Sequence, residues 1–223
     1  MNIHWLNKNN NKKLIVFLSG WSFDYKPFIT LSPTDYDIAF VYDYNNLSIP
    51  KDFEQFQNYE NKTLISWSMG VFVGYLLRKH FEDFDYKLSI NGTLFPVDDK
   101  FGIPVKIFEL TLKYAKKSLE GQFYKNIFLT EEEYNLYSSY PVQRSIENRT
   151  SELANLYNLI KNNKQENCEP FYDFAIVSEF DKIIPPKNQI ASHNYCKIPT
   201  ISLPYGHFLF YNFFSWDEII QCR

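Results

Sequence analysis

The sequence is poor in the residues that build disulfide frameworks and metal centres. Its three cysteines, Cys168, Cys196 and Cys222, have no CxxC spacing, and its four histidines form no HxxxH or HxxH pattern. A sparse and odd set of cysteines is typical of free thiols in a reducing compartment. The sequence therefore predicts free thiols, and we expect neither a metal site nor a cofactor.

Long apolar runs and an excess of positive charge are also absent. The first apolar run, Leu14–Ser19, is too short for the core of a signal peptide, and no run approaches the roughly 18 apolar residues of a membrane span. A net charge of −3 argues against nucleic acid as the main partner, because phosphate binding needs a broad basic surface. We expect a cytoplasmic protein that binds neither membranes nor nucleic acids.

Short apolar runs alternate with helix-like segments along much of the chain. Continuous apolar strands indicate a parallel sheet covered on both faces, so the alternation predicts an α/β fold with a mostly parallel sheet flanked by helices. The expected strands are Leu14–Ser19, Ile38–Tyr42, Thr63–Trp67, Lys87–Asn91, Phe171–Glu179 and Lys197–Leu203. The expected helices of this part are Met69–Phe81, Pro186–Tyr195 and Trp216–Cys222.

The alternation stops between about Gly102 and Asn167, where only helix signals occur. The stretch VKIFELTLKYAKKSLE is amphipathic, and Thr130 and Glu133 form a capping-box pattern at the start of another helix. We interpret residues 102–167 as a helical lid insertion, and residues 1–101 and 168–223 as the core that carries it.

The segment SWSMG places Ser68 between a predicted strand and a predicted helix. This is the layout of a nucleophile elbow, in which the usual first glycine is replaced by Ser66. The neighbours two residues away must be small because the turn is tight, and Ser66 and Gly70 meet that need. The alternative interpretation is an ordinary packed serine.

A serine nucleophile needs a base, and the base needs an orienting acid. His207 follows the last expected strand and a glycine, in LPYGHFLF, which suits a loop that aims an imidazole. Asp181 follows the strand FAIVSEF and precedes a helix start at Pro185 and Pro186, so it is the preferred acid. Less well placed alternatives are the acids Glu179, Asp98 and Asp99 and the histidines His4, His80 and His193.

Two backbone N–H groups are candidates for an oxyanion hole. One belongs to Met69, directly after the nucleophile, and the other to Trp21, in the glycine-containing loop after the first expected strand. Each part of the site then lies at the carboxyl end of a strand, where ligands bind in open α/β sheets.

Five segments resemble the BioG-type pimeloyl-[acyl-carrier protein] methyl ester esterases, which are α/β-hydrolases of biotin synthesis. They are FLSGWSFD, SWSMGVFVG, INGTLFPVDDKFGIP, FDKIIPP and PYGHFLF. The most specific part combines Asn91-Gly92-Thr93 with Phe101–Pro104. The resemblance implies Ser68 as nucleophile, Asp181 as acid and His207 as base, with Trp21 and Met69 as oxyanion donors. It also implies an acyl carrier protein as partner and release of methanol from a carrier-bound C7 chain.

The insertion could supply a docking surface for such a carrier, which is acidic. Residues 101–130 contain five lysines against two glutamates, and the spacing of Lys106, Lys113 and Lys117 could place them on one helix face. Lys116, Arg144 and Arg149 could extend the patch. The alternative is a solvated helix face.

Two other functions remain open from the sequence. One is a general short-chain esterase or acyl thioesterase with the same three residues, and the other is a noncatalytic α/β-hydrolase that serves as a binding module.

Overall fold

The strands of the protein form one mixed sheet. The computed structural model describes residues 1–163 and 168–222, and the strand order within them is β1-β3-β2-β4-β5-β6-β7. β1 pairs antiparallel with β3, and every other neighbouring pair is parallel. The strands are β1 (Asn2–Asn7), β2 (Lys13–Leu18), β3 (Tyr36–Tyr42), β4 (Asn61–Trp67), β5 (Tyr86–Ile90), β6 (Phe174–Ser178) and β7 (Thr200–Leu203).

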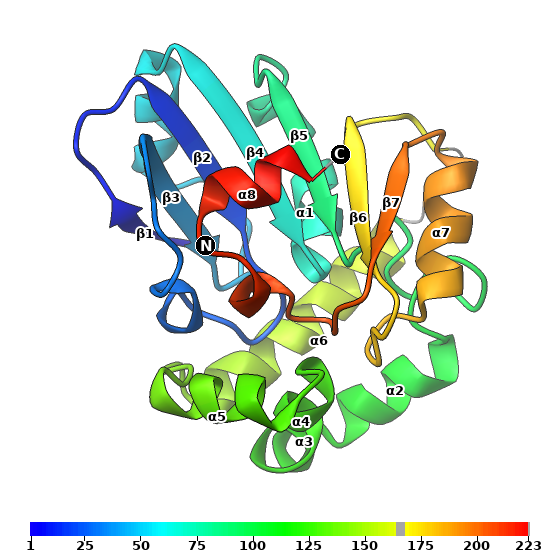
Figure 1. Ribbon diagram of the computed structural model, residues 1–223. Coiled ribbons are helices and arrows are strands. Elements are labelled where there is room, and N and C mark those ends of the chain that lie inside the picture. The colour runs from blue at the N-terminus through cyan, green and yellow to red at the C-terminus, as the bar shows by residue number, and fades with distance from the viewer. Residues whose placement is uncertain (164–167, 223) are drawn as a thin grey trace.

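Helices cover both faces of this sheet and one of its ends. Figure 1 shows α8 in front of the sheet, α1 behind it, and α2–α5 below the sheet with α6 running between them and the strands. This confirms the predicted mostly parallel sheet flanked by helices. The α-helices are α1 (Met69–Leu76), α2 (Val105–Lys113), α3 (Ala115–Glu120), α4 (Phe123–Ile127), α5 (Glu131–Ser139), α6 (Ile146–Asn162), α7 (Pro186–Tyr195) and α8 (Trp216–Gln221). Short 3₁₀ helices are η1 (Lys26–Phe28), η2 (Lys51–Asn58), η3 (Arg78–His80) and η4 (Phe210–Asn212).

The first strand, β1, was not predicted from the sequence. It lies at the edge of the sheet, and each of its side chains is half-buried or exposed. Central strands such as β2 are buried along almost their whole length, and such strands read as continuous apolar runs, whereas a partly solvated edge strand does not. The six predicted strands each overlap an observed one.

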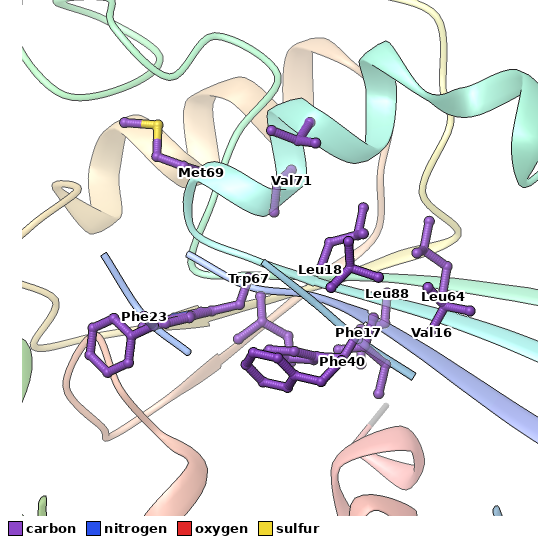
Figure 2. Packing of buried hydrophobic residues seen from close by; sticks show 14 of the residues in the cluster. Val16, Phe17, Leu18, Phe23, Phe40, Leu64, Trp67, Met69, Val71 and Leu88 are labelled. Carbon is purple, nitrogen blue, oxygen red and sulfur yellow. The ribbon is translucent and has the colours of Figure 1, made fainter. Parts of the chain in front are cut away.

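The core consists of two side-chain layers, one on each face of the sheet. Phe17 packs edge-on against Trp216 of α8, with ring centroids 5.1 Å apart, and the neighbouring residue Leu18 points to the opposite face, as alternation along a strand requires. Figure 2 shows Phe17 and Phe40 on one side of the sheet, and Leu18 on the side where Val71 of α1 lies. Burying a side chain of this size contributes roughly 2–3 kcal/mol, so both helix layers are firmly attached.

The described residues between β5 and β6 contain helices α2–α6. One break was not expected: α2 ends at Lys113 and α3 begins at Ala115, because Tyr114 leaves helical geometry at φ −112° and ψ 22°. The predicted capping box of Thr130 and Glu133 is present at the start of α5. The predicted end of the insertion, residues 164–167, lies outside the described residues. Within the part of the chain that the structure describes, no helix has the length and apolar character of a membrane-spanning segment.

Two of the three cysteines are joined in a disulfide, so the prediction of free thiols is wrong for this pair. Cys168 and Cys196 have Cα atoms 5.1 Å apart, within the usual range for a disulfide, whereas Cys222 is free. Their separation of 28 residues in sequence gives no hint of the pairing. It arises because Cys168 precedes β6 and Cys196 follows α7, which pack together.

The buried His193 of α7 is expected to make stability depend on pH. Burial lowers the pKa of His193 from its ordinary 6.5 to about 4, although a hydrogen bond with the backbone of Gly92 opposes the shift. Between these two pKa values the unfolded chain binds a proton that the folded protein does not. Stability is therefore full above about pH 6.5 and falls as the pH drops toward 4, by roughly 3 kcal/mol for this residue.

Urea unfolding of the wild type and the His193→Gln variant between pH 4 and 7 would measure this term. The free energy of unfolding should fall more steeply with acidification in the wild type, and His80→Gln, an exposed histidine change, should leave the wild-type slope intact. Equal slopes for wild type and His193→Gln would contradict the expectation.

Candidate active site

Ser68 lies on a sharp turn between β4 and α1. Its φ of 57° and ψ of −124° are strained for a residue with a side chain. The N–H of Ser68 donates to the carbonyl of Ile90 at 2.9 Å, which ties the turn to β5. A Cβ atom on Gly70 would collide with the carbonyl oxygens of Leu18 and Ser19. Only glycine therefore lets α1 start this close to β2, and the turn is held in its strained shape.

Three side chains from separate loops meet beside this turn. The Nε2 atom of His207 lies 2.9 Å from Oγ of Ser68, and the Nδ1 atom of His207 lies 2.7 Å from Oδ2 of Asp181. All three residues are buried. When Nδ1 donates to the carboxylate, Nε2 is free to accept the hydroxyl proton of the serine. The arrangement can therefore turn the Ser68 hydroxyl into a nucleophile.

Asp181 is oriented by groups other than the histidine. Its Oδ1 accepts hydrogen bonds from the N–H groups of Ile183 at 2.7 Å and Ile184 at 3.0 Å, and its Oδ2 accepts one from the side chain of Gln189 at 2.8 Å. Gln189 was not expected from the sequence. The available signal was its position one turn into α7, the helix that follows the acid loop.

The loop that carries His207 is fixed through its own backbone. The carbonyl oxygen of His207 accepts from Nε1 of Trp67 and from Nδ2 of Asn91, both at 2.9 Å. The buried Asn91 also donates to Oγ of Ser178 at 2.8 Å and accepts from its N–H at 2.7 Å. Asn91 thus links the ends of β5 and β6 to the base loop. In the sequence Asn91 stands out only as part of the resemblance, although an amide directly after a buried strand is a signal for such a role.

The backbone N–H groups of Trp21 and Met69 are available beside Ser68. Both residues line the same pocket as Ser68 and His207. None of the hydrogen bonds among residues 1–163 and 168–222 uses either N–H group. They could therefore donate to a negative charge that develops on a carbonyl oxygen attacked by Ser68.

The alternative acids and histidines lie away from this cluster. Glu179 is exposed, and Asp98 and Asp99 accept backbone N–H bonds within their own loop. The other histidines are His4, stacked on Tyr25, His80, which lies in η3 after α1, and the buried His193 of α7.

The four lysines assigned to carrier docking are exposed on α2 and α3. Lys106 and Lys113 belong to α2, whereas Lys116 and Lys117 belong to α3. The break at Tyr114 separates the two helices, so the prediction that Lys117 shares one helix face with Lys106 and Lys113 is wrong.

The two arginines do not join that surface, and the structure contradicts their assignment to docking. The side chain of Arg144 is 6% exposed and pairs with Asp43 at 3.3 Å and Glu152 at 2.9 Å. Arg149 is buried, and its Nη1 donates to the hydroxyl of Tyr124 at 2.5 Å. Both guanidinium groups serve contacts inside the protein.

A pocket of about 180 Å³ opens beside Ser68 and His207. It is smaller than the roughly 300–1,000 Å³ of pockets for drug-sized ligands, so it suits a narrow chain. Aromatic and aliphatic side chains line it together with several polar ones, and α2, α3 and α4 each contribute to this lining. A larger cavity of about 360 Å³ contains none of the three residues. The lining residues are Trp21, Phe23, Trp67, Ser68, Met69, Ile103, Ile107, Phe108, Thr111, Ser118, Gln122, Phe123, Asn126, Ile127, Leu153, Lys182, Ile183 and His207.

The described residues contain no group of three or more His, Cys, Asp or Glu side chains placed to hold a metal ion.

Comparisons with known proteins identify the fold. A family model described as pimeloyl-ACP methyl esterase BioG matches residues 1–219. The crystal structure of BioG from Haemophilus influenzae is 27% identical and covers 98% of this chain and 99% of its own, with a TM-score of 0.84. A lipase-esterase related protein from Clostridium acetobutylicum, 15% identical, covers 93% and 92% with a TM-score of 0.56. The fold is the α/β-hydrolase fold.

One longer relative carries a different name. Malonyl-[acyl-carrier protein] O-methyltransferase from Bacteroides fragilis (strain 638R) is 31% identical over 191 residues. The match covers 83% of this chain, and this chain spans 37% of the length of that relative.

Proposed function

The chain belongs to the BioG family of pimeloyl-ACP methyl esterases, and on this premise we propose that it hydrolyses the methyl ester of pimeloyl-[acyl-carrier protein] in biotin synthesis. Family and fold together make it an ester hydrolase. The observation that carries the proposal is the chain of hydrogen bonds from Ser68 through His207 to Asp181, at 2.9 and 2.7 Å, with Ser68 and His207 in the lining of a small pocket.

The first half of the proposed reaction forms an acyl-enzyme. Oγ of Ser68 attacks the ester carbonyl while Nε2 of His207 takes its proton, and the resulting oxyanion accepts from the N–H groups of Trp21 and Met69. Asp181 stabilises the imidazolium cation. His207 then gives the proton to the departing methoxide, and methanol leaves.

The second half frees the carboxylate. Nε2 of His207 removes a proton from a water molecule, which attacks the acyl-enzyme carbonyl at the position that methanol has left. The second tetrahedral intermediate collapses, and the proton returns to Oγ of Ser68. Water is the only co-reactant, and the products are methanol and a carrier-bound chain with a free carboxylate.

The pocket and the insertion support a carrier-bound chain as substrate. A pocket of about 180 Å³ with aromatic and aliphatic walls can hold an unbranched acyl chain with its ester end at Ser68. In this proposal residues 102–167 act as a lid over the core formed by residues 1–101 and 168–223. The lysine-bearing helices α2 and α3 then face an acidic carrier, because the same helices contribute Ile107 and Ser118 to the pocket lining.

The name of the longer relative fits the same chemistry. It describes the transfer of a methyl group to a carrier-bound malonyl group, and a methyl ester on a carrier-bound acid is the bond that the proposed activity cleaves.

Comparison of a carrier-bound and a free substrate tests the proposed function. The kcat/KM for pimeloyl-[acyl-carrier protein] methyl ester should exceed that for free monomethyl pimelate by about 10–10³-fold, the range that electrostatic steering of association provides. Exchanging Lys113, Lys116 and Lys117 for Glu should remove most of this advantage and leave the rate on the free ester unchanged. Added salt should reduce the advantage in the wild type, because it screens exposed charges.

A matched triple variant controls for net charge. Lys12→Glu, Lys51→Glu and Lys79→Glu change three exposed lysines outside α2–α6, so the carrier advantage should persist in that variant. Equal rates on both substrates in the wild type would favour a general esterase or thioesterase instead. An equal loss in the two triple variants would refute docking on α2 and α3.

A further inference from the structure

Glu152 is a buried acid of α6 that the proposed mechanism leaves unused. Its side chain has no exposed surface, and each of its oxygens accepts a backbone N–H: Oε2 from Ser22 at 3.0 Å and Oε1 from Tyr44 at 2.8 Å. Nη1 of Arg144 lies 2.9 Å from Oε2. Burial raises the pKa of Glu152, while Arg144 and the two N–H donors oppose that rise. Both oxygens face donors only, which is the environment that a buried carboxylate needs to stay ionised.

The two N–H groups belong to loops that follow adjacent parallel strands. Ser22 lies in the loop after β2, directly after Trp21, and Tyr44 lies just after β3. Glu152 comes from the insertion, more than 100 residues further along the chain. It therefore joins the insertion to the loop that holds the candidate oxyanion donor.

The hydrogen bond from Ser22 to Glu152 holds an unusual backbone conformation. Ser22 has a φ of 73°, a left-handed value that is uncommon for a residue with a side chain and that surrounding contacts must hold in place. The peptide plane between Trp21 and Ser22 is set by the bond to Glu152. This plane and the preceding one, which carries the N–H of Trp21, meet at the Cα atom of Trp21. The indole of Trp21 is held by its own bond to the carbonyl of Arg149 at 2.7 Å, so a displacement of the Ser22 N–H changes φ and ψ of Trp21 and with them the direction of its N–H.

Further bonds join the same loop to the insertion, and all of them come from α4, α6 or the segment before α6. They are Trp21 Nε1 to the carbonyl of Arg149 at 2.7 Å, the N–H of Gln143 to Oδ2 of Asp24 at 2.7 Å, Arg144 Nη1 to the carbonyl of Phe23 at 3.1 Å, and the hydroxyl of Tyr124 to Oγ of Ser22 at 3.2 Å.

We propose that Glu152 is a positioning residue, which aims the N–H of Trp21 at the oxyanion by holding the N–H of Ser22, with Arg144 as its counterion. The inference rests on the proposed function, because it needs the tetrahedral intermediate at Ser68. It assigns to Arg144 a role in the oxyanion loop in place of carrier docking. It also makes part of the insertion a component of the catalytic site rather than only a cover.

The Glu152→Gln variant tests the proposal on a small methyl ester without a carrier. Glutamine keeps the shape of the side chain but presents an NH₂ group to one of the two N–H donors. One of the hydrogen bonds that Glu152 accepts is therefore lost. Loss of a whole oxyanion donor costs about 10²–10³-fold, so misaiming one should lower kcat by roughly 10–10²-fold, with KM nearly unchanged. The pH profile of kcat/KM should keep its midpoint, because the bonds of His207 are untouched.

A transition-state analogue distinguishes a misdirected N–H of Trp21 from a general loss of active-site structure. An alkylboronic acid forms a tetrahedral adduct with Ser68 that places an oxygen at the oxyanion donors, so its affinity should fall by the same factor as kcat/KM. Glu147→Gln, an exposed change on the same helix, should leave both quantities at wild-type values.

If Glu152→Gln does not fold, Arg144→Lys decides the question. It keeps the positive charge but loses the geometry of the guanidinium group, and a smaller parallel loss in kcat/KM and boronate affinity is expected. Wild-type kcat in the folded variant overturns the proposal, as does a fall in kcat without a fall in boronate affinity. Failure of the proposed function would appear elsewhere, as persistent turnover after removal of the Ser68 hydroxyl or as indifference to the carrier.

Discussion

Replacing Ser68 with Ala is expected to lower kcat for ester hydrolysis by about 10⁶-fold, the size of effect known for removal of a serine nucleophile. The hydroxyl lies 2.9 Å from Nε2 of His207, and no other hydroxyl has this contact among the described residues. Alanine keeps the Cβ atom and the N–H bond to Ile90. Folding should therefore be unaffected, and the oxyanion donors should retain a small residual activity.

Initial rates on the carrier-bound methyl ester, together with thermal unfolding, measure this expectation. Ser89→Ala is the matched control, because Ser89 is buried in the neighbouring strand β5 and its hydroxyl has no partner within the described part of the chain. Its activity should equal that of the wild type. Turnover by the Ser68 variant within tenfold of the wild-type rate would rule out the serine mechanism.

The Asp181→Asn variant should lose about 10⁴-fold in kcat, with little change in KM. The Oδ2 atom that faces Nδ1 of His207 at 2.7 Å would become an NH₂ group, which donates. The ring would then place its proton on Nε2, facing Ser68, and could not accept the hydroxyl proton. The bonds from Ile183 and Ile184 to Oδ1 survive in asparagine, so the acid loop should keep its shape.

Single-turnover rates and the NMR signal of the imidazole proton would show whether the tautomer has changed. Glu179→Gln is the matched control, since this exposed acid lies two residues earlier in the same segment. A variant with asparagine at 181 that keeps more than a tenth of wild-type kcat would exclude Asp181 as the orienting acid, whatever the effect of the control.

The parts of the fold that could be predicted from the sequence are segments whose own residue pattern shows that they are buried. The strands β2–β6 carry apolar runs because helices cover both of their faces, and α7 begins at Pro186 as the proline pair predicts. The edge strand β1 and the break at Tyr114 were missed. Both depend on contacts with segments that are distant in sequence, and the local residue pattern does not show these contacts.

The candidate site divides in the same way. Ser68, Asp181 and His207 each follow a strand, and in a parallel sheet these strand ends share one edge. The supporting groups were not visible to that argument, because Asn91 and Glu152 bind segments that are distant in sequence, and Gln189 reaches Asp181 from α7, eight residues later in the chain. The limit is clearest for two basic residues between β5 and β6, since Arg144 forms a buried ion pair and Lys113 stays exposed.

Local residue patterns specify the alternation of strands and helices, the strained turn at Ser68, and the order in which oxyanion loop, serine, acid and histidine occur. Each of these follows from steric and solvation preferences of a few consecutive residues. Three contacts arise only when the chain is packed: the pairing of Cys168 with Cys196, the bonds of Asn91 to two loops, and the bond of Glu152 in α6 to the loop after β2. Those contacts join segments far apart in the chain, and they form because a buried polar group must find a partner wherever packing places it.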